Sequence, residues 1–278
     1  MLVTLLSCGL QSCLTVGSLM FAVPAPYLGV WKRSLLTTGS GHRDTTTLVL
    51  WLQTQTLFAD LRIPVPVPAE GCSSLQDCSG QQLLQLAQQQ GFAGVTDVSA
   101  DICTWHRELD FQPKSGPPDV GKMEFVTNDF VTEDDPTGEN RYHEVWQRLE
   151  GSSGVSWGYR LQAVDEPQRK GFLLGAGSFF FFAADRQVNL PSEGDLESHL
   201  TSTASVDQQQ ALLAMELSFG TIDKHGGRAA WTIAHSTVPG RVGQVLLSPD
   251  LTLDALKNTS TLQLGFLCPK GGWKLSPA

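Results

Sequence analysis

Residues 51–64 read Trp-Leu-Gln-Thr-Gln-Thr-Leu-Phe-Ala-Asp-Leu-Arg-Ile-Pro, and this stretch predicts two antiparallel strands joined by a short turn. Residues 45–54 form a run rich in strand-forming types, and residues 57–63 form a second run after a polar turn at 53–55. Pro64 ends the second strand, because proline cannot donate a hydrogen bond to a neighbouring strand. A mainly β fold is therefore expected.

Part of this hairpin recurs later in the chain. Phe-Ala-Asp-Leu-Arg at 58–62 corresponds to Phe-Ala-Ala-Asp-Arg at 182–186. Six of the seven tryptophans also form pairs that are 126 or 127 residues apart: Trp31 and Trp157, Trp105 and Trp231, and Trp146 and Trp273. A constant offset of this size indicates one unit of about 126 residues that is present twice.

Each unit follows the order hairpin, helix, antiparallel meander. Ser79 is expected to cap the first helix and Gly91 to end it, and helical segments are expected again between residues 195 and 213. Later strands are expected at 102–112, 120–127, 142–149, 229–235 and 242–247. Because closure removes exposed strand edges, the pattern predicts two tandem antiparallel barrels, each with one interposed helix. The first covers residues 24–150 and the second residues 155–278, with residues 1–23 as an extension outside the core.

The start of the first barrel carries Gly29-Val30-Trp31. A Gly-x-Trp at the first strand resembles the signature of lipocalins and the wider calycin group, in which the tryptophan plugs one end of the barrel. The second half departs from it, because Trp157 is preceded by Val155 and Ser156. The resemblance implies two lipocalin-like barrels in which Trp31 is a core plug.

The expected strand at 102–112 carries the candidate binding site. Alternation places Cys103, Trp105, Arg107, Leu109 and Phe111 on one face, and Thr104, His106, Glu108 and Asp110 on the other. If the apolar face points inward, Arg107 is a cation inside a barrel, where a charge is unfavourable unless it is paired. Three interpretations stay open: a fork for a ligand carboxylate, an ion pair with Asp60 or Glu124, or a rim position that reaches water.

The predicted ligand-binding residues are Arg107, Trp105, Leu109, Phe111 and Trp51. At the common offset Arg107 corresponds to Ile233 and His106 to Thr232, so the second half lacks these charges. The first barrel is therefore the expected site.

Metal and catalytic motifs are not found in the sequence. His106, His143 and His235 have no partners at ligand spacing, and His106 and His143 are expected on outward faces. Residues 133–135, Glu-Asp-Asp, are interpreted as a turn with solvated charges. The sequence holds no nucleophile elbow, phosphate loop or dinucleotide fingerprint, so we expect no catalytic residue, metal or cofactor.

Composition narrows the partners and the compartment. The net charge of −9 disfavours a nucleic-acid binder, which needs a basic face. Residues 1–21 are apolar but lack a positive residue and contain several polar ones, so they make a poor signal peptide and a poor membrane span. We expect a cytoplasmic protein, or a secreted one if residues 1–25 are a signal peptide. Cys72 and Cys78 are expected as reduced thiols, with a small disulfide loop as the alternative.

A wider resemblance covers nearly the whole chain from residue 24. It rests on residues 51–64, on Tyr-His-Glu-Val-Trp-Gln at 142–147, and on residues 171–185, 216–222 and 231–239. These resemble the fungal Hri-type proteins with twin calycin-like barrels and similar bacterial hypothetical proteins. The resemblance implies the fold and supplies no catalytic residues.

Three functions are expected, in order of preference. The first is a non-enzymatic lipocalin-like protein that binds a small hydrophobic or acidic molecule in the first barrel. The second is a protein-interaction module with solid barrels, in which the phenylalanines at 179–182 are either a strand buried between the barrels or a partner surface. The third is a calycin-type isomerase or hydrolase, which requires a carboxylate or histidine facing inward beside Arg107.

Overall fold

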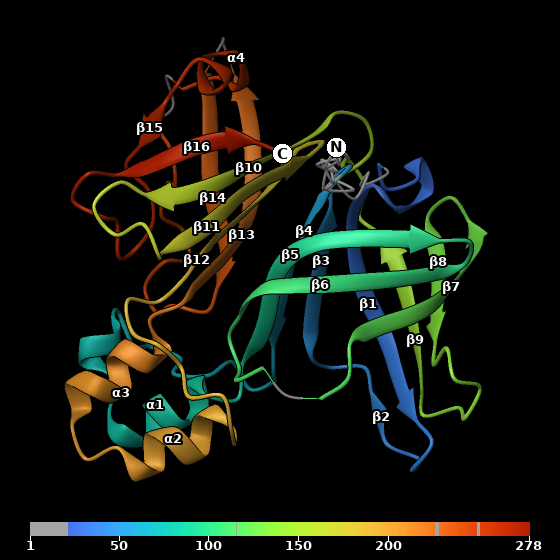
Figure 1. The fold of residues 1–278 in the computed structure, drawn as a ribbon, viewed down its shortest axis with the longest axis horizontal. Helices are drawn as coiled ribbons and strands as arrows, with labels where there is room; N and C mark the ends of the chain where they lie inside the picture. Colours follow the sequence, from blue (N-terminus) through green and yellow to red (C-terminus); the bar gives the residue numbers. More distant parts are fainter. Residues whose placement is uncertain (1–21, 115, 226–227, 249–250) are drawn as a thin grey trace, which may run out of the picture.

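The computed structural model describes residues 22–114, 116–225, 228–248 and 251–278. The fold is mainly β, with two antiparallel barrels in tandem that lie side by side, and three helices packed together at one end of the second barrel (Figure 1). The strands of the first barrel run from Gly29 to Arg148, and those of the second from Ser156 to Pro277.

The first barrel is closed. Its eight main strands pair in chain order, and the first strand then pairs with the last, from Trp31 opposite Arg148 to Thr38 opposite Tyr142. Closure leaves these strands without a free edge. The strands are β1 (Gly29–Thr38), β3 (Leu48–Gln53), β4 (Leu57–Ile63), β5 (Gln90–Ser99), β6 (Ile102–Asp110), β7 (Asp119–Thr127), β8 (Phe130–Asp134) and β9 (Tyr142–Arg148), with the short β2 (Arg43–Asp44) beside β1.

The second sheet is curled but open. Its order is β14-β13-β12-β11-β10-β16-β15, and β14 does not pair with β15 in the described part of the chain. Its strands are β10 (Ser156–Ala163), β11 (Lys170–Ala176), β12 (Phe179–Ala184), β13 (Glu216–His225), β14 (Arg228–Ser236), β15 (Thr261–Leu262) and β16 (Trp273–Pro277).

Two strands of the first barrel have no counterpart in the second. The strand expected at 242–247 is not formed, and the described residues there make turns and one isolated bridge, Thr232 with Val245. The strands without a counterpart are β2 and β7, because β15 pairs with β16 as β8 pairs with β9. The short helix α4 (Leu253–Lys257) lies between β14 and β15, where the first half has β7 between β6 and β8. The second sheet therefore stays open.

The tryptophan pairs lie on corresponding strands. Trp31 and Trp157 are on the first strand of each half, Trp105 and Trp231 are on β6 and β14, and Trp146 and Trp273 are on the last strand. All of them except Trp157 are buried. The offset read from the sequence therefore corresponds to a repeated structural position.

Helices form where the sequence predicts them, between β4 and β5 in the first half and between β12 and β13 in the second. In α1 (Gly80–Leu86), Ser79 caps the helix: its side chain accepts from the Gln82 N–H, and the Gln82 side chain accepts from the Ser79 N–H. The second half has two helices there, α2 (Leu196–Ser202) and α3 (Val206–Leu213). Two short 3₁₀ turns, η1 (Ala25–Tyr27) and η2 (Leu75–Asp77), lie in the first half.

Gly91 is not a helix end, as the sequence suggested, but the second residue of β5. A Cβ on Gly91 would lie 2.6 Å from the Asp60 carbonyl oxygen and 2.5 Å from Leu217 Cδ1. Glycine is therefore needed for the close approach of two strands and of the second barrel.

Three apolar cores hold the molecule together. One fills part of the first barrel and another fills the second. The third lies between the barrels and around the helices, and it includes Leu61, Phe111, Phe181 and Leu217. On β12, Phe180 and Phe182 face the second barrel and Phe181 faces the core between the barrels. The phenylalanine run is thus a buried strand and not a partner surface.

The first barrel begins slightly earlier than expected. Val23 is buried in the first barrel's core, and its N–H donates to the Gln55 carbonyl oxygen at 2.8 Å. Most of the predicted extension, residues 1–21, lies outside the described residues. No helix in the described part of the chain is long and apolar enough to cross a membrane.

Candidate functional site

The interior of the first barrel is divided into an aromatic half and a charged half. In the aromatic half Trp51 stacks on Trp31, with ring centroids 6.2 Å apart, and meets Trp105 and Trp146 edge-on at 5.5 and 5.9 Å. The space left beside these rings has a volume of about 20 Å³, enough for one water molecule. A hydrophobic ligand therefore has no room there.

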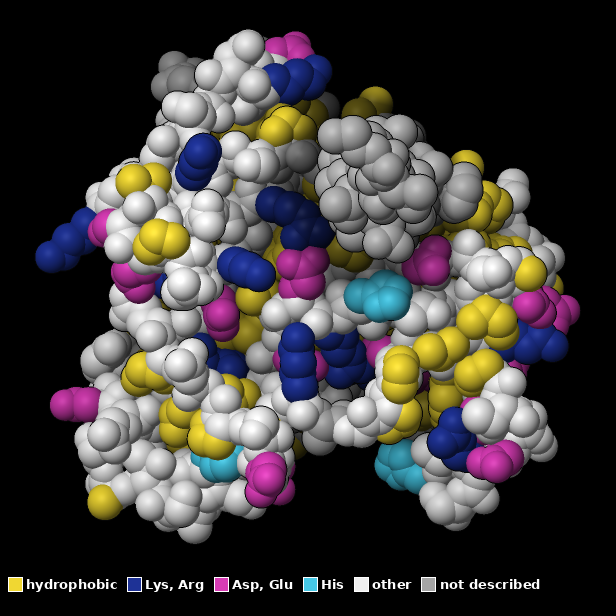
Figure 2. All heavy atoms as spheres, viewed as in Figure 1, with side chains coloured by type: hydrophobic (Ala, Val, Ile, Leu, Met, Phe, Trp, Pro, Cys, Tyr) yellow, Lys and Arg dark blue, Asp and Glu magenta, His cyan; other side chains and the backbone are white. Residues whose placement is uncertain are grey.

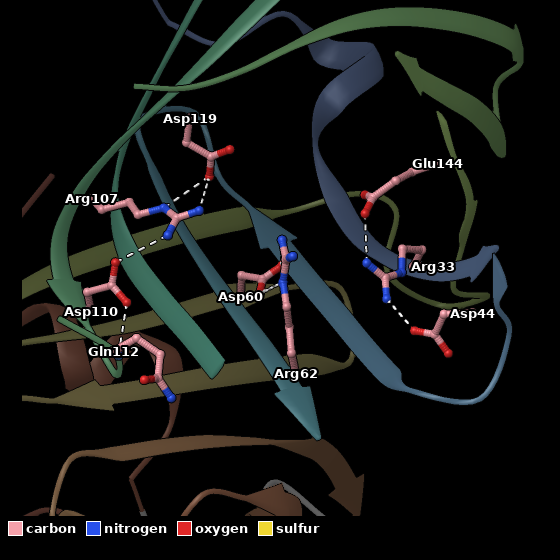
Figure 3. A network of polar contacts seen from close by, with 9 residues as sticks. All are labelled: Arg33, Asp44, Asp60, Arg62, Arg107, Asp110, Gln112, Asp119 and Glu144. Atoms are coloured by element: carbon pink, nitrogen blue, oxygen red, sulfur yellow. Dashed lines mark hydrogen bonds and ion pairs between the residues drawn. The ribbon is translucent and has the colours of Figure 1, made fainter. Parts of the chain in front are cut away.

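The charged half opens to solvent as a cavity of about 810 Å³, which we call the mouth of the first barrel. Side chains of both signs line it, and Figure 3 shows Arg107 of β6 pointing toward Asp119 of β7 and toward Asp110. Basic and acidic side chains also lie beside one another on the face shown in Figure 2. The charged lining residues are Arg62, Arg107, Asp110, Lys114, Asp119, Glu133, Arg141 and Glu144.

A β-bulge decides which predicted site residues reach this mouth. Gly94 lies opposite Arg107, but Ala93 lies opposite Leu109, so β6 has one extra residue there. The extra residue reverses the alternation along the strand. Trp105 and Arg107 point inward, whereas Leu109 and Phe111 pack in the core between the barrels. The prediction that all four share one face was wrong for Leu109 and Phe111.

Arg107 is fully engaged with acidic partners. Its Nη2 and Nε lie 2.6 and 3.0 Å from Asp119 Oδ2, and its Nη1 lies 3.2 Å from Asp110 Oδ2. The guanidinium also lies over the Phe92 ring, 3.5 Å from its centroid. Arg107 is therefore part of an internal ion-pair network in which each of its three guanidinium nitrogens already contacts an acidic side chain.

The partners proposed for Arg107 from the sequence were wrong. Asp60 instead accepts from Arg62 Nε at 2.8 Å, and burial raises the pKa of Asp60 despite this pairing. Glu124 is on the outward face of β7 and is exposed. Asp110, which was expected on the outward face, points inward, and burial raises its pKa although Arg107 lowers it.

Glu133 and Glu144 face each other inside the barrel. They are directly opposite on β8 and β9, and both are buried. Glu144 Oε1 accepts from Arg33 Nη1 at 2.7 Å, and Arg33 also binds Asp44 at 2.8 Å. The interpretation of Glu133 as a solvated turn residue was wrong, because its strand β8 was not recognised.

Among the described residues, Glu133 has no cationic partner within ion-pair distance. Its Oε1 lies 3.2 Å from the Tyr142 hydroxyl oxygen, which lies 3.0 Å from the Val120 carbonyl oxygen. Burial, and then the neighbouring charge of Glu144, raise the pKa of Glu133 well above its usual value. A protonated Glu133 can donate to Tyr142, which then donates to Val120.

A second unpaired polar group lies just below the mouth. The buried Trp146 Nε1 has no hydrogen-bond partner among the described residues. Trp146 and Glu133 both line the small cavity of about 20 Å³. An N–H donor without an acceptor is unusual in a protein interior, so this cavity is suited to one water molecule or one polar ligand atom.

The histidines do not form a metal site. His106 is exposed at the edge of the mouth, and His143 lies 2.7 Å from Asp134 on the outer face. His235 stacks on Phe219, and burial lowers its pKa. In the parts of the chain that the structure covers, no three acidic, histidine or cysteine side chains are grouped for a metal ion.

Several residues of the mouth were missed in the sequence. Tyr142 and Glu144 alternate with Trp146, so placing Trp146 inside the barrel would also have placed these two inside. Asp119 directly follows the Gly-Pro-Pro turn and has no such signal. Arg62 shares a face with Asp60, which was considered only as a partner for Arg107.

The fold and the mouth together define a protein of two tandem barrels whose first barrel has a charged opening. No protein-family model matches the sequence, and no curated protein is significantly similar to it in sequence. A crystal structure of the uncharacterized protein YLR301w from Saccharomyces cerevisiae is similar over 90% of this chain and 98% of that chain, with a TM-score of 0.54 and 15% sequence identity. At that identity the likeness concerns the fold alone.

Proposed function

We propose that the protein is a non-enzymatic binding protein whose first barrel holds a small organic cation, such as an amine, in its mouth. The observation that carries this proposal is the Glu133–Glu144 pair at the wall of the mouth. Two carboxylates directly opposite each other on neighbouring strands repel when both are ionised. Of the two, only Glu144 has an arginine within ion-pair distance. A cation bound beside Glu133 supplies the partner that Glu133 lacks and favours its ionised form over the protonated one.

The shape of the barrel supports a small polar ligand. The mouth has a volume of about 810 Å³, within the range of roughly 300–1,000 Å³ that is usual for ligand sites. The sequence led us to expect a hydrophobic or an acidic ligand. The apolar half is filled by tryptophans, and the arginine expected to bind an acid is bound by Asp119 and Asp110.

Matched molecules of equal length test the charge of the ligand. Cadaverine, pentanediol and glutarate carry two amines, two hydroxyls and two carboxylates on similar carbon chains. We expect cadaverine to bind in isothermal titration calorimetry and the other two to bind at least about tenfold more weakly, a difference of about 1.4 kcal/mol. Tighter binding of glutarate would contradict the proposal.

A pair of matched variants tests the site. Glu133→Gln removes the carboxyl that ionises beside a bound cation, whereas Glu124→Gln makes the same change on the outward face of β7. We expect Glu133→Gln to weaken cadaverine binding by about tenfold or more and Glu124→Gln to leave it unchanged. Equal affinities of the two variants would exclude Glu133 as the binding group.

One observation favours a second candidate, an isomerase or hydrolase. Carboxylates do face inward beside Arg107, and Glu133 has a raised pKa next to Tyr142 at a mouth that is open to solvent. Such a carboxyl can exchange a proton with a substrate. Turnover in a panel of activated esters and enolisable ketones that is lost in Glu133→Gln would favour this candidate, and absence of turnover would remove it.

We also propose that the two halves arose by duplication of a lipocalin-like barrel, as in the Hri-type proteins that the sequence resembles. The same β-bulge supports this, since Gly94 lies opposite Arg107 and Gly220 lies opposite Ile233 at an offset of 126 residues. Deep sequencing of folded variants should show the same tolerance at both bulges, and unrelated tolerance patterns would argue against duplication.

A reducing compartment, as in the cytoplasm, is proposed from the cysteines. Cys72, Cys78, Cys103 and Cys268 are free thiols in the structure. We expect all four of these thiols to be alkylated when the protein is purified from its source without reductant and then unfolded. A Cys72–Cys78 disulfide in that material would favour secretion instead.

A further inference from the structure

The end of the first barrel that carries Trp31 is closed by the side chain of Tyr27. Tyr27 is buried, and its ring meets Phe125 edge-on with centroids 4.8 Å apart. Its carbonyl oxygen accepts from Trp31 Nε1 at 2.8 Å, which joins the plug to the tryptophan. The first barrel therefore supplies an aromatic ring from its own 3₁₀ turn to fill this end.

Among the described residues, the same end of the second barrel has no such plug. At the common offset of 126 residues Tyr27 corresponds to Ser153, which is exposed. Trp157, which corresponds to the fully buried Trp31, is half-buried. Beside it is a cavity of about 510 Å³, lined mainly by Trp157, Tyr159, Ile222, Ala229, Leu253 and Lys257.

The walls of this cavity correspond to the surroundings of the plug. Trp157 takes the place of Trp31, and Ala229 takes the place of Cys103, which packs in the same core as Tyr27. Helix α4 borders the cavity where the first barrel has β7 and Phe125. The cavity is therefore apolar and aromatic on the side where Tyr27 lies in the first barrel.

The position of the Trp157 ring and the Tyr159 hydroxyl both suit the cavity to an aromatic ring that carries a polar group. A Cβ on Gly175 would lie 2.2 Å from the Trp157 ring, so the ring packs directly on the strand and is held in place. Tyr159 is only 7% exposed, and its hydroxyl makes no hydrogen bond to the described residues. At the rim, Lys257 Nζ lies 2.9 Å from Asp254, so these two charges neutralise each other.

We propose that this cavity of the second barrel binds a small aromatic molecule whose ring takes the place that the Tyr27 ring takes in the first barrel. A polar group on the molecule hydrogen-bonds the Tyr159 hydroxyl. The volume suits a molecule of one or two rings. Aromatic rings in contact with Trp157 and Tyr159 gain edge-to-face interactions that an aliphatic ring cannot make. The site is separate from the mouth of the first barrel and does not depend on its function.

Phenol and cyclohexanol are matched probes for the aromatic class, since they share size and hydroxyl group. Binding is followed by the NMR signal of the Trp157 indole N–H, which is identified by its loss in Trp157→Phe. We expect a saturable shift with phenol. We expect cyclohexanol to bind at least about fivefold more weakly than phenol. No saturable shift with phenol, or equal affinities for both, would overturn the proposal.

Neighbouring substitutions on β14 test the location. Ala229→Leu fills the cavity, whereas Ala230→Leu adds the same side chain on the other face of the strand. We expect Ala229→Leu to weaken phenol binding by about tenfold or more and Ala230→Leu to leave it unchanged. Unchanged binding in Ala229→Leu would overturn the proposal.

A gentler variant covers the case in which Ala229→Leu does not fold. Tyr159→Phe removes one hydroxyl, so we expect it to weaken phenol binding by about threefold to tenfold and to leave toluene binding unchanged. Phenol binding that is insensitive to this change would remove the role of the hydroxyl. Glu133→Gln should not affect phenol, which separates failure at this site from failure at the mouth of the first barrel.

Discussion

Arg107 and Ile233 occupy the same position in the two barrels, each beside a β-bulge and opposite a glycine. Gly94 pairs with Arg107 after a register shift next to Ala93, and Gly220 pairs with Ile233 after a register shift next to Phe219. The backbone is therefore repeated while the side chain changes from a cation to an apolar group. Arg107 belongs to the charged half of the first barrel, whereas Ile233 belongs to the apolar core of the second.

The two bulge glycines should be equally intolerant of a side chain. A Cβ on Gly94 would lie 2.0 Å from the His106 carbonyl oxygen, and one on Gly220 would lie 2.1 Å from the Thr232 carbonyl oxygen. Backbone atoms cannot move aside cheaply, so each glycine-to-alanine change should lower the free energy of unfolding by about 2 kcal/mol or more. Urea denaturation measures this loss.

Gly80 provides the control for these substitutions. A Cβ there would meet nothing within 4 Å, and Gly80 begins helix α1. Gly80→Ala should be neutral or stabilising by about 0.5 kcal/mol. A loss at Gly94 or Gly220 no larger than the effect at Gly80 would show that the bulges can rearrange.

Removal of Arg107 should cost stability in a pH-dependent way. Arg107→Leu leaves Asp110 and Asp119 without their shared cation, and Asp110 is largely buried. The expected loss at neutral pH is about 1–3 kcal/mol, since Arg107 is partly exposed. The loss should shrink on acidification, because protonated carboxyls need no cation. A loss that does not vary with pH would mean that packing on Phe92 dominates.

Glu133 should make the protein less stable as the pH rises. Its pKa is raised in the folded protein, so the fold favours the protonated form, and this contribution is complete below the unfolded pKa. The contribution is lost as the pH rises through the folded pKa. Glutamine mimics the protonated carboxyl, so Glu133→Gln should melt at a higher temperature than the original protein in mildly alkaline buffer and at a similar one in acid. Glu124→Gln, on the outer face, should not raise the melting temperature in alkaline buffer.

Cys78 should be slow to react in the folded protein. Burial, and then its contact with Cys72, raise the pKa of the Cys78 thiol to about 12. Because only the thiolate is nucleophilic, alkylation by iodoacetamide near neutral pH should be on the order of a thousandfold slower than in the unfolded chain. Peptide mass spectrometry measures the rates at individual cysteines. Rapid labelling of Cys78 would show that this segment opens readily.

The overall fold could be predicted because its signals are local or periodic. The tryptophan offset survives as matched strand positions, and the capping residues of α1 are adjacent in sequence. Strands β5 and β8 were not predicted, each for a different reason. Gly91 resembles a helix end when its strand neighbours are unknown, and residues 133–135 are acidic although the barrel wall buries Glu133 and Asp135.

The binding site could be predicted only as far as the bulge in β6. Before the bulge, alternation correctly placed Trp105 and Arg107 inside. After the bulge, Leu109 and Asp110 lie on the faces opposite to those predicted. The residue types at 107–108 do not indicate that the strand has an extra residue there. The meeting of Glu133 with Glu144 depends on the register of two strands, which the sequence does not encode locally.

The core between the barrels means that the repeated unit is not an independent unit of folding. Residues of both halves, among them Leu61, Phe111, Phe181 and Leu217, share one buried cluster. Hydrogen bonds join the halves as well, such as that from Arg186 to the Phe111 carbonyl oxygen at 2.8 Å. Cutting the chain between residues 150 and 155 would expose this cluster on both fragments. We therefore expect the intact chain to unfold in a single cooperative transition, and neither fragment to fold without the other.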